Sequence, residues 1–293
     1  MPRVREPAVA GSFYAGRREA LLGSLEECFL HQLGPGALPE VNPNGPGVIA
    51  ALVSPHAGYM YSGPAAAHGF AALAADGIPD CAVILGPSHR SLGRAAAVSL
   101  VDAWRTPLGE VVVDVQLGRC LVESTDLLVG DDDTHRWEHS LEVQVPFLQF
   151  VYGQRTPSIV PICVRAHPDD DLDQLVADAD ALGRTLADGL AGKRAVVIAS
   201  SDFSHQIPHA AAERQDKLAL DQILALDPVG LLRTVQERKI STCGPVAVAI
   251  ALVYCRAKGG GKAQLLRYYT SGDITGDRTA VVGYASAVIR LRR

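Results

Sequence analysis

Three short apolar stretches of the sequence each run directly into a turn that carries a histidine. They are IAALVSPH, which ends at His56, AVILGPSH, which ends at His89, and VVIASSDFSH, which contains Asp202 and His205. Continuous aliphatic runs of this length are typical of parallel strands that are buried on both faces. Ligand sites in open α/β sheets form beyond the carboxyl ends of such strands. The sequence therefore predicts that several imidazoles meet at one edge of a sheet, in a metal site.

Composition and charge narrow the class of protein. Of 293 residues, 48% are hydrophobic and 20% charged, the formal net charge is −5, and lysine and arginine are scattered. These values argue against a nucleic-acid surface or a polybasic membrane face. The first residues lack the apolar core of a signal peptide, and a long charge-free stretch, residues 47–75, is broken by proline and glycine. The six cysteines contain no C-x-x-C pair, so a cytoplasmic protein with reduced thiols is expected.

The spacing of apolar residues predicts alternating strands and helices along the chain. The expected strands are 48–54, 82–86, 95–101, 110–115, 158–164, 195–200, 264–270 and 280–291. The expected helices are 17–33, 63–75, 116–129, 169–190, 209–226 and 245–257. Residues 141–151 fit either period and stay open. Because no linker or break in composition divides the chain, we expect one three-layer α/β domain, residues 1–293, with a central mixed, largely parallel sheet.

His56 and His89 share a local context. Each follows an apolar strand, and a proline, Pro55 or Pro87, stiffens the turn before the imidazole. A single histidine after a strand is more often a loop residue that forms hydrogen bonds. Neutral imidazole is, however, the commonest protein ligand for transition metals, and a ligand ring must be held in place. We therefore interpret the matched pair as candidate metal ligands.

The third turn offers Asp202 and His205, three residues apart. If a metal binds, one of them is a candidate ligand and the other a candidate general base, because a carboxylate near an imidazole orients it and raises its basicity. The alternative is that Asp202 caps the helix expected at 209–226 and that His205 is simply exposed.

Cys243 precedes Gly244-Pro245 at the start of an expected helix. The dipole and free N–H groups of a helix N-terminus favour the thiolate, which is the form that binds metals and attacks electrophiles. The alternative is a small buried residue that lets a helix pack closely on the sheet. The role of Cys243 as ligand or nucleophile stays open.

Residues 138–142, EHSLE, form one more polar cluster after an acidic loop. His139 and Glu142 are expected either to line the cleft or to cap a helix. Motifs of other enzyme classes are missing: the sequence has no G-x-S-x-G, no H-E-x-x-H, no Walker A loop and no strand-linked G-x-G-x-x-G. A serine hydrolase would have to crowd its nucleophile and His205 into one turn, which disfavours that class.

Six blocks of sequence resemble the Memo family, which in bacteria and archaea is also called AmmeMemoRadiSam system protein B. The blocks are collinear and are followed by a final GYASA at 283–287, so the resemblance spans nearly the whole chain. The six blocks are PAVAGSFY at 7–14, PHAGY at 55–59, GPSH at 86–89, EHSLE at 138–142, SDFSH at 201–205 and TCGP at 242–245.

The resemblance implies a fold similar to class III extradiol dioxygenases, in which two histidines and a glutamate hold Fe(II). By this resemblance His56 and His89 match the two histidine ligands, and Cys243 stands at the third ligand. His205 falls at the acid–base position, with Asp202 beside it, and His139 completes the polar wall. A thiolate in place of a carboxylate makes the site softer, so copper and zinc join iron as candidate metals. Ring cleavage does not follow from the fold alone.

Three functions follow as expectations. The first is a mononuclear metal-binding protein with a pocket of two histidines and one cysteine, Fe(II) as its foremost metal, and redox or oxygen-linked activity. The second is a non-catalytic module that holds a peptide or protein in the cleft, and the third is a metal-dependent hydrolase. The cleft is expected to take a small molecule or peptide. The family's system name implies radical-SAM and AMMECR-type protein partners. From composition and charge, no nucleic acid or membrane partner is expected.

Overall fold

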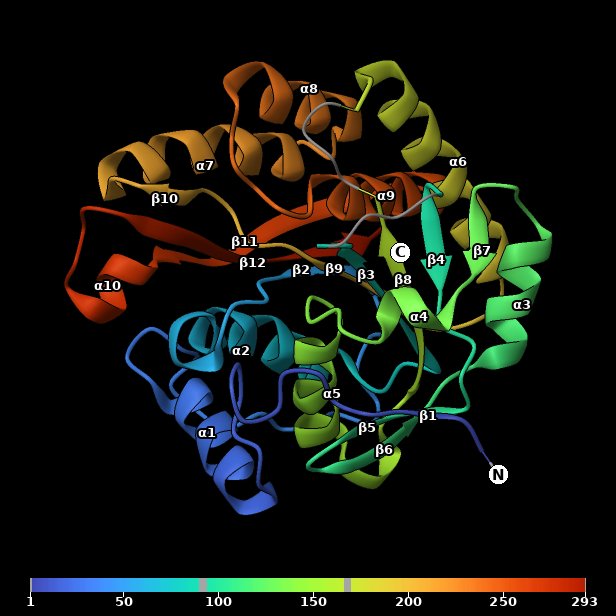
Figure 1. Ribbon diagram of the computed structural model, residues 1–293, viewed down its shortest axis with the longest axis horizontal. Coiled ribbons are helices and arrows are strands. Elements are labelled where there is room, and N and C mark those ends of the chain that lie inside the picture. The colour runs from blue at the N-terminus through green and yellow to red at the C-terminus, as the bar shows by residue number, and fades with distance from the viewer. Residues whose placement is uncertain (1, 90–93, 166–169, 293) are drawn as a thin grey trace.

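Nine strands of the described residues form one twisted mixed sheet with helices on both faces (Figure 1). The computed structural model describes residues 2–89, 94–165 and 170–292. The strands lie in the order β10-β12-β2-β9-β3-β8-β4-β7, and β11 pairs with β12 outside this path. Their bounds are β2 Ile49–Ser54, β3 Cys81–Pro87, β4 Ala96–Val98, β7 Leu128–Gly130, β8 Ser158–Val164, β9 Ala195–Ser200, β10 His205–Ile207, β11 Gly261–Thr270 and β12 Val281–Leu291.

The centre of the sheet is parallel, and the strands that border it on either side run antiparallel to it. Strands β2, β9, β3 and β8 are neighbours that run in one direction, and Ser54 at the end of β2 lies opposite Ser200 at the end of β9. Strand β12 runs antiparallel to β2, and β4 runs antiparallel to β8. The four central strands are buried almost throughout, which explains their continuous aliphatic sequences. The predicted α/β class with a mixed sheet is confirmed.

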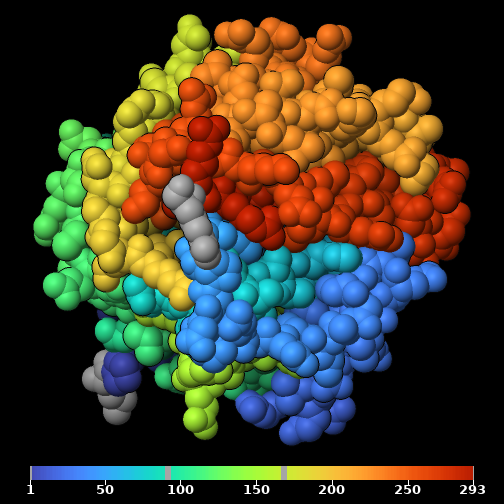
Figure 2. All heavy atoms as spheres, turned by 180° about the vertical axis from the view of Figure 1, so that it is seen from behind, coloured from blue at the N-terminus to red at the C-terminus, as the bar shows by residue number. Residues whose placement is uncertain are grey.

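Helices cover the two faces of the sheet as separate layers, each with its own apolar core. One layer holds α1 (Arg18–Leu30), α2 (Tyr59–Asp76) and α5 (Val145–Tyr152), and the other holds α6 (Leu172–Gly189), α7 (His209–Leu224), α8 (Pro228–Arg238) and α9 (Pro245–Ala257). Figure 2 shows the long β11–β12 pair, in red, between the orange α7–α8 layer and the blue α1–α2 layer. None of the helices in the described residues is long and apolar enough to cross a membrane.

The remaining elements lie at the margins of these layers. Helix α3 contacts β7 and α6, and a small second sheet has the order β1-β5-β6. Two 3₁₀ turns precede and follow α5. The bounds are β1 Val4–Arg5, β5 Ala103–Thr106, β6 Gly109–Val112, α3 Val115–Glu123, α4 Asp132–His135 and α10 Ser271–Thr275, with the 3₁₀ turns at Glu142–Gln144 and Gly153–Arg155.

Several predicted boundaries are wrong for identifiable reasons. Helix α2 begins at Tyr59, whose backbone N–H donates to the Phe13 carbonyl at 2.8 Å. Pro64 therefore lies inside the helix and not in its first turn. The segment 116–129 divides into α3 and β7. The open segment 141–151 is helical, with Pro146 in the first turn of α5, where its missing N–H is harmless.

Several shorter elements and one full helix escaped prediction. Helix α8 was not predicted, although Asp227 and Pro228 are typical of a helix start. The Asp227 side chain accepts the Gly230 N–H. The strand β5 lies between the expected strands 95–101 and 110–115. Helix α6 begins at Leu172 with Asp171 as its cap, and Asp169, where the predicted helix began, lies outside the described residues.

Candidate metal centre

The strand order brings the predicted turns to one edge of the sheet. Strands β2, β9 and β3 are adjacent and parallel, so the segments that carry His56, Asp202 and His89 leave the sheet side by side. Cys243 joins them from the loop before α9. The Asp202 N–H donates to Cys243 Sγ at 3.1 Å, and the Cys243 N–H donates to the Asp202 carbonyl at 3.3 Å. The predicted juxtaposition of these residues is therefore present.

Three imidazoles form a compact group at this edge. One ligand nitrogen from each of His56, His89 and His139 lies within 4.8 Å of the others, so the group could hold a metal ion. The His89 and His139 rings are stacked with their centroids 4.4 Å apart, and His56 stands edge-on to both. The sequence interpretation placed His139 in the wall of the cleft. The structure adds its ring to the possible donors, and its catalytic role stays a prediction.

Cys243 lies beside this group. Its Sγ is 3.1 Å from His56 Nε2, a thiol–imidazole hydrogen-bond distance. The expectation that the helix start favours a thiolate is wrong for the metal-free protein. Burial, and next the neighbouring Asp202 carboxyl, hold the pKa of the Cys243 thiol well above its usual range. A bound transition metal favours the deprotonated thiol, so ligation would release this proton. The role of Cys243 as metal ligand stays a prediction.

The buried carboxylate of Glu138 orients His89. Its Oε1 lies 2.9 Å from His89 Nδ1, and its Oε2 accepts the His89 backbone N–H at 2.7 Å. Burial raises the pKa of Glu138, but the hydrogen bonds and charge of His89 outweigh burial and leave the pKa well below its ordinary value. Because a carboxylate only accepts, His89 Nδ1 carries the ring proton and Nε2 is free to bind a metal. The sequence interpretation missed Glu138, although it adjoins His139.

Within this group, the two more buried imidazoles, His56 and His139, have a protonation state that suits metal binding. Burial, followed by the nearby His139 and His89, holds the pKa of His56 well below its ordinary value. Burial also lowers the pKa of His139. Burial lowers the pKa of His89 too, but its bond to Glu138 outweighs this, so the pKa of His89 lies above its ordinary value. At neutral pH His56 and His139 are therefore neutral rings with a lone pair to offer.

Asp202 supports His56 and does not cap a helix. Its Oδ1 accepts the His56 backbone N–H at 2.7 Å, whereas the residue that precedes α7 is Pro208. His205 lies at the outer side of the turn, where its Nδ1 is 2.6 Å from the Ser241 carbonyl. Because a carbonyl only accepts, Nδ1 carries a proton in this contact. The predicted acid–base roles of Asp202 and His205 stay predictions.

Replacing Asp202 with asparagine is expected to remove one pH-dependent contribution to stability. Burial raises the pKa of Asp202 from 3.8 to about 6. A carboxyl whose pKa rises on folding stabilises the protein fully below its unfolded pKa, and the contribution is lost as pH rises through the folded pKa. The full shift in the pKa of Asp202 corresponds to about 3 kcal/mol of folding free energy.

Urea unfolding of the metal-free protein near the two ends of this pH window measures the effect. Between about pH 4 and pH 6, wild type should lose about 2 kcal/mol more stability than the Asp202→Asn variant. Parallel stability curves for the two proteins would show that folding does not raise the pKa of Asp202.

The N-terminal segment pins the loop that carries His139. Arg5 donates to the carbonyls of His135 and Glu138, each at 2.7 Å, and to Glu142 Oε2 at 2.6 Å. Glu142 was expected to line the cleft or to cap a helix. Instead it is 1% exposed and binds the N-terminal segment.

Glu142 has further donors in the same segment. Its carboxylate accepts the backbone N–H groups of Ala8 and Val9 and the hydroxyl of Tyr14. The ring of Phe13 packs on His139 with a centroid distance of 4.7 Å. The PAVAGSFY block is therefore a structural support of the site and forms part of its wall.

Replacing Gly86 with alanine is expected to displace the His139 loop. A Cβ on Gly86 would lie 2.7 Å from Ser140 Oγ and 3.0 Å from Leu141 Cδ1, closer than packed atoms allow. Overpacking of this kind costs about 1–3 kcal/mol. Gly23→Ala is the matched control, because its Cβ meets nothing within 4 Å in α1 and should stabilise by about 0.5–1 kcal/mol. Thermal unfolding compares the two, and an unchanged melting temperature for Gly86→Ala would contradict the close contact.

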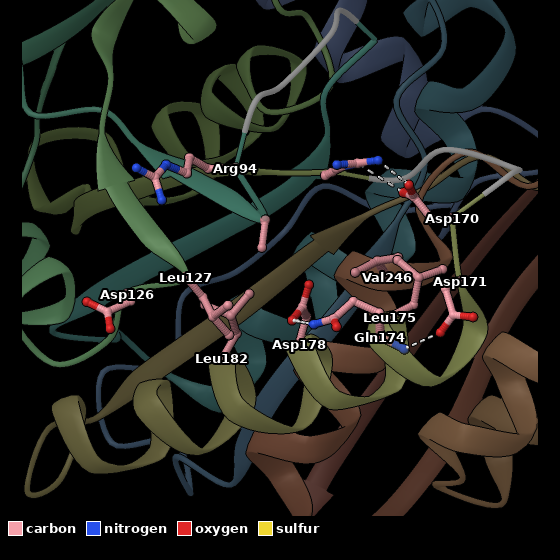
Figure 3. Close-up of a pocket in the computed structure, with 12 residues that line it drawn as sticks. Arg94, Asp126, Leu127, Asp170, Asp171, Gln174, Leu175, Asp178, Leu182 and Val246 are labelled. Carbon is pink, nitrogen blue, oxygen red and sulfur yellow. Dashed lines mark hydrogen bonds and ion pairs between the residues drawn. The ribbon is translucent and has the colours of Figure 1, made fainter.

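A separate cavity of about 410 Å³ lies beside α6 (Figure 3). Gln174 and Asp178 of α6 and Val246 of α9 contribute to its lining, as Figure 3 shows. Its charges are partly satisfied, because Asp170 pairs with Arg165 and Asp178 accepts from Gln174. None of the three grouped histidines lines it, so it is distinct from the metal centre.

The fold and the site together define a class: an α/β protein with a histidine group that could hold a metal ion at the carboxyl edge of its sheet. Comparison with known proteins narrows this class. The family model described as Memo-like protein matches residues 5–288. This chain belongs to the Memo family.

Relatives of known sequence match this chain over almost their full length. The chain is 44% identical to a MEMO1 family protein of Methanopyrus kandleri, covering 98% of this chain and 99% of the relative. It is 43% identical to a MEMO1 family protein of Sulfolobus acidocaldarius, covering 97% and 98%. Among solved structures, an uncharacterized protein of Escherichia coli K12 matches with a TM-score of 0.53 at 16% identity, covering 82% of this chain and 99% of that one. This last match supports the fold alone.

Proposed function

We propose that this protein holds one transition-metal ion between His56, His89 and Cys243, with His139 as a further nitrogen donor, and uses it in redox or oxygen-linked chemistry. One observation carries the proposal: three imidazole nitrogens lie within 4.8 Å of one another, and a thiol lies 3.1 Å from one of them. Two ligands of one tetrahedral ion are separated by about 3.5 Å, given bonds of about 2.0–2.3 Å. The distances between these donor atoms are close to that spacing, so only small side-chain movements would be needed to bind an ion.

The donor set favours a transition metal. Imidazole and thiolate suit iron, copper and zinc, whereas magnesium and calcium prefer oxygen ligands. We propose Fe(II) first, with copper and zinc as the alternatives. When bound, such an ion would polarise a substrate oxygen and, if iron or copper, exchange an electron with it.

The protein's own groups prepare the site for this role. Glu138 fixes the proton of His89 on Nδ1, so Nε2 is presented to the ion. Asp202 Oδ1 accepts the backbone N–H of His56 and so fixes the position of that residue. His205 bonds the Ser241 carbonyl through Nδ1, and through Nε2 it would accept or return a substrate proton.

Metal counting tests the proposal. The protein is purified without oxygen, exposed to Fe(II), Cu(I) or Zn(II), freed of excess ion and analysed for bound metal. Wild type should retain about one ion per chain, and the His56→Ala/Cys243→Ala double variant should retain none. If wild type takes up no more metal than the double variant, the proposal is wrong. Binding of a peptide, of radical-SAM and AMMECR-type proteins, and hydrolysis stay predictions from the sequence.

A further inference from the structure

The ring of His56 has two nitrogens in different surroundings. Nε2 lies 3.1 Å from Cys243 Sγ, and Nδ1 lies 2.9 Å from Ser200 Oγ on the opposite side. The side chain is buried, so both contacts are removed from water. A neutral imidazole carries a single ring proton. Whichever nitrogen holds that proton cannot bind a metal, so the hydrogen bond at Nδ1 decides whether Nε2 is available.

The hydroxyl of Ser200 has one proton and three neighbours. Its Oγ lies 2.6 Å from the Ser140 carbonyl, which can only accept. It also lies 2.9 Å from Gln144 Nε2 and 2.9 Å from His56 Nδ1. If the hydroxyl proton goes to Ser140, both remaining neighbours must donate to Ser200. If it went to His56, the Ser200 and Ser140 oxygens would face each other at 2.6 Å without a proton between them.

The contacts of Gln144 show that it donates to Ser200 and does not accept from it. Its Nε2 lies 2.9 Å from the Pro55 carbonyl, an acceptor, so the amide nitrogen and not the amide oxygen must stand there. The two amide protons are then committed, one to Pro55 and one to Ser200. The Gln144 Oε1 is buried without a hydrogen-bond partner among the described residues. The favourable contribution of this side chain therefore comes from its two N–H groups.

We propose that Ser200, whose hydroxyl donates to the Ser140 carbonyl and accepts from Gln144, is a positioning residue that holds His56 in the Nδ1–H tautomer and so presents its Nε2 lone pair to the metal centre. Every donor in the chain has one acceptor: Gln144 donates to Ser200, Ser200 donates to Ser140, and His56 Nδ1 donates to Ser200. The importance of this tautomer for metal binding rests on the proposed function. The tautomer itself is a property of the metal-free protein.

Nitrogen NMR of the metal-free protein tests the inference. Long-range ¹H–¹⁵N spectra of histidine-labelled protein at neutral pH identify which ring nitrogen of His56 is protonated. Wild type should show Nδ1–H alone. Ser200→Ala removes the acceptor and should produce an Nε2–H signal, whereas Ser200→Thr keeps the hydroxyl and should restore Nδ1–H. Gln144→Met, which keeps the shape but loses both donors, is the control: the Ser200–Ser140 hydrogen bond remains, so the Nδ1–H signal should persist.

Metal titration provides the second readout. Ser200→Ala should bind Zn(II) about 10–100-fold more weakly than wild type, and Ser200→Thr should recover most of that loss. An Nε2–H signal in wild type, or an unchanged Nδ1–H signal in Ser200→Ala, overturns the inference. If the tautomer changes as expected but wild type binds no metal, the inference stands and the proposed function fails. A purely structural role would lower the melting temperature and leave the tautomer unchanged.

Discussion

Replacing His89 with alanine is expected to weaken transition-metal binding at least 100-fold. The ring supplies one of the three grouped nitrogens, and Glu138 holds its proton on the far side. Loss of a group that only orients a ligand costs about 10–100-fold in affinity, so loss of the ligand itself should cost more. With 38% of its side chain exposed, His89 can be removed with less damage to the core than the buried His56.

Competition titration with a chelating indicator measures this affinity. The matched control is His31→Ala, because His31 caps α1 outside the histidine group. Its affinity should equal that of wild type. Circular dichroism before each titration shows that the variant is folded. Wild-type affinity in a folded His89→Ala variant would exclude His89 as a ligand.

Replacing Arg5 with methionine is expected to destabilise the protein by about 3–5 kcal/mol. The side chains of Arg5 and Glu142 are 5% and 1% exposed, so the change leaves a carboxylate buried without its cation. The guanidinium also bonds the carbonyls of His135 and Glu138 and lies 4.2 Å from the centre of the Trp104 ring. Because these contacts hold the loop that carries His139, metal affinity should fall as well.

Denaturant unfolding measures the loss of stability. Arg105→Met is the matched control, since Arg105 pairs with Glu6 and Glu110 at the surface, where ion pairs are screened by solvent. The control should unfold at the wild-type denaturant concentration. If both variants unfolded together, the Arg5–Glu142 pair would contribute no more than a surface pair.

The sequence predicted the edge of the sheet where the site lies because this information is local. The apolar runs that end at His56, His89 and Asp202 each specify a buried strand and the turn that follows. Parallel strands place those turns at one edge whatever their order. The adjacency of β2, β9 and β3, which brings the turns into contact, is a property of the folded sheet.

The supports of the site could not be predicted from local patterns. Arg5 and Glu142 are 137 residues apart in sequence, and Glu138 reaches His89 across 49. No periodicity links such positions. For the same reason the sequence did not predict that His139 joins the imidazole group. The loop that carries His139 is held in place by bonds of Arg5 and Ser140 and not by a strand.

Burial explains the one chemical expectation that was wrong. A helix start favours a thiolate when the sulfur is open to solvent, but the Cys243 thiol lies among buried groups beside Asp202, and its pKa is raised. The free energy of removing a charge from water exceeds the contribution of the helix dipole.

The central claim is that His56, His89 and Cys243, with His139 beside them, hold one ion. Anomalous diffraction from crystals grown without oxygen in Fe(II), measured on both sides of the iron absorption edge, tests it most directly. The account predicts a single peak about 2.0–2.3 Å from His56 Nε2, a His89 ring nitrogen and Cys243 Sγ. A metal peak elsewhere on the chain, with these three side chains bonded only to protein groups, would contradict it.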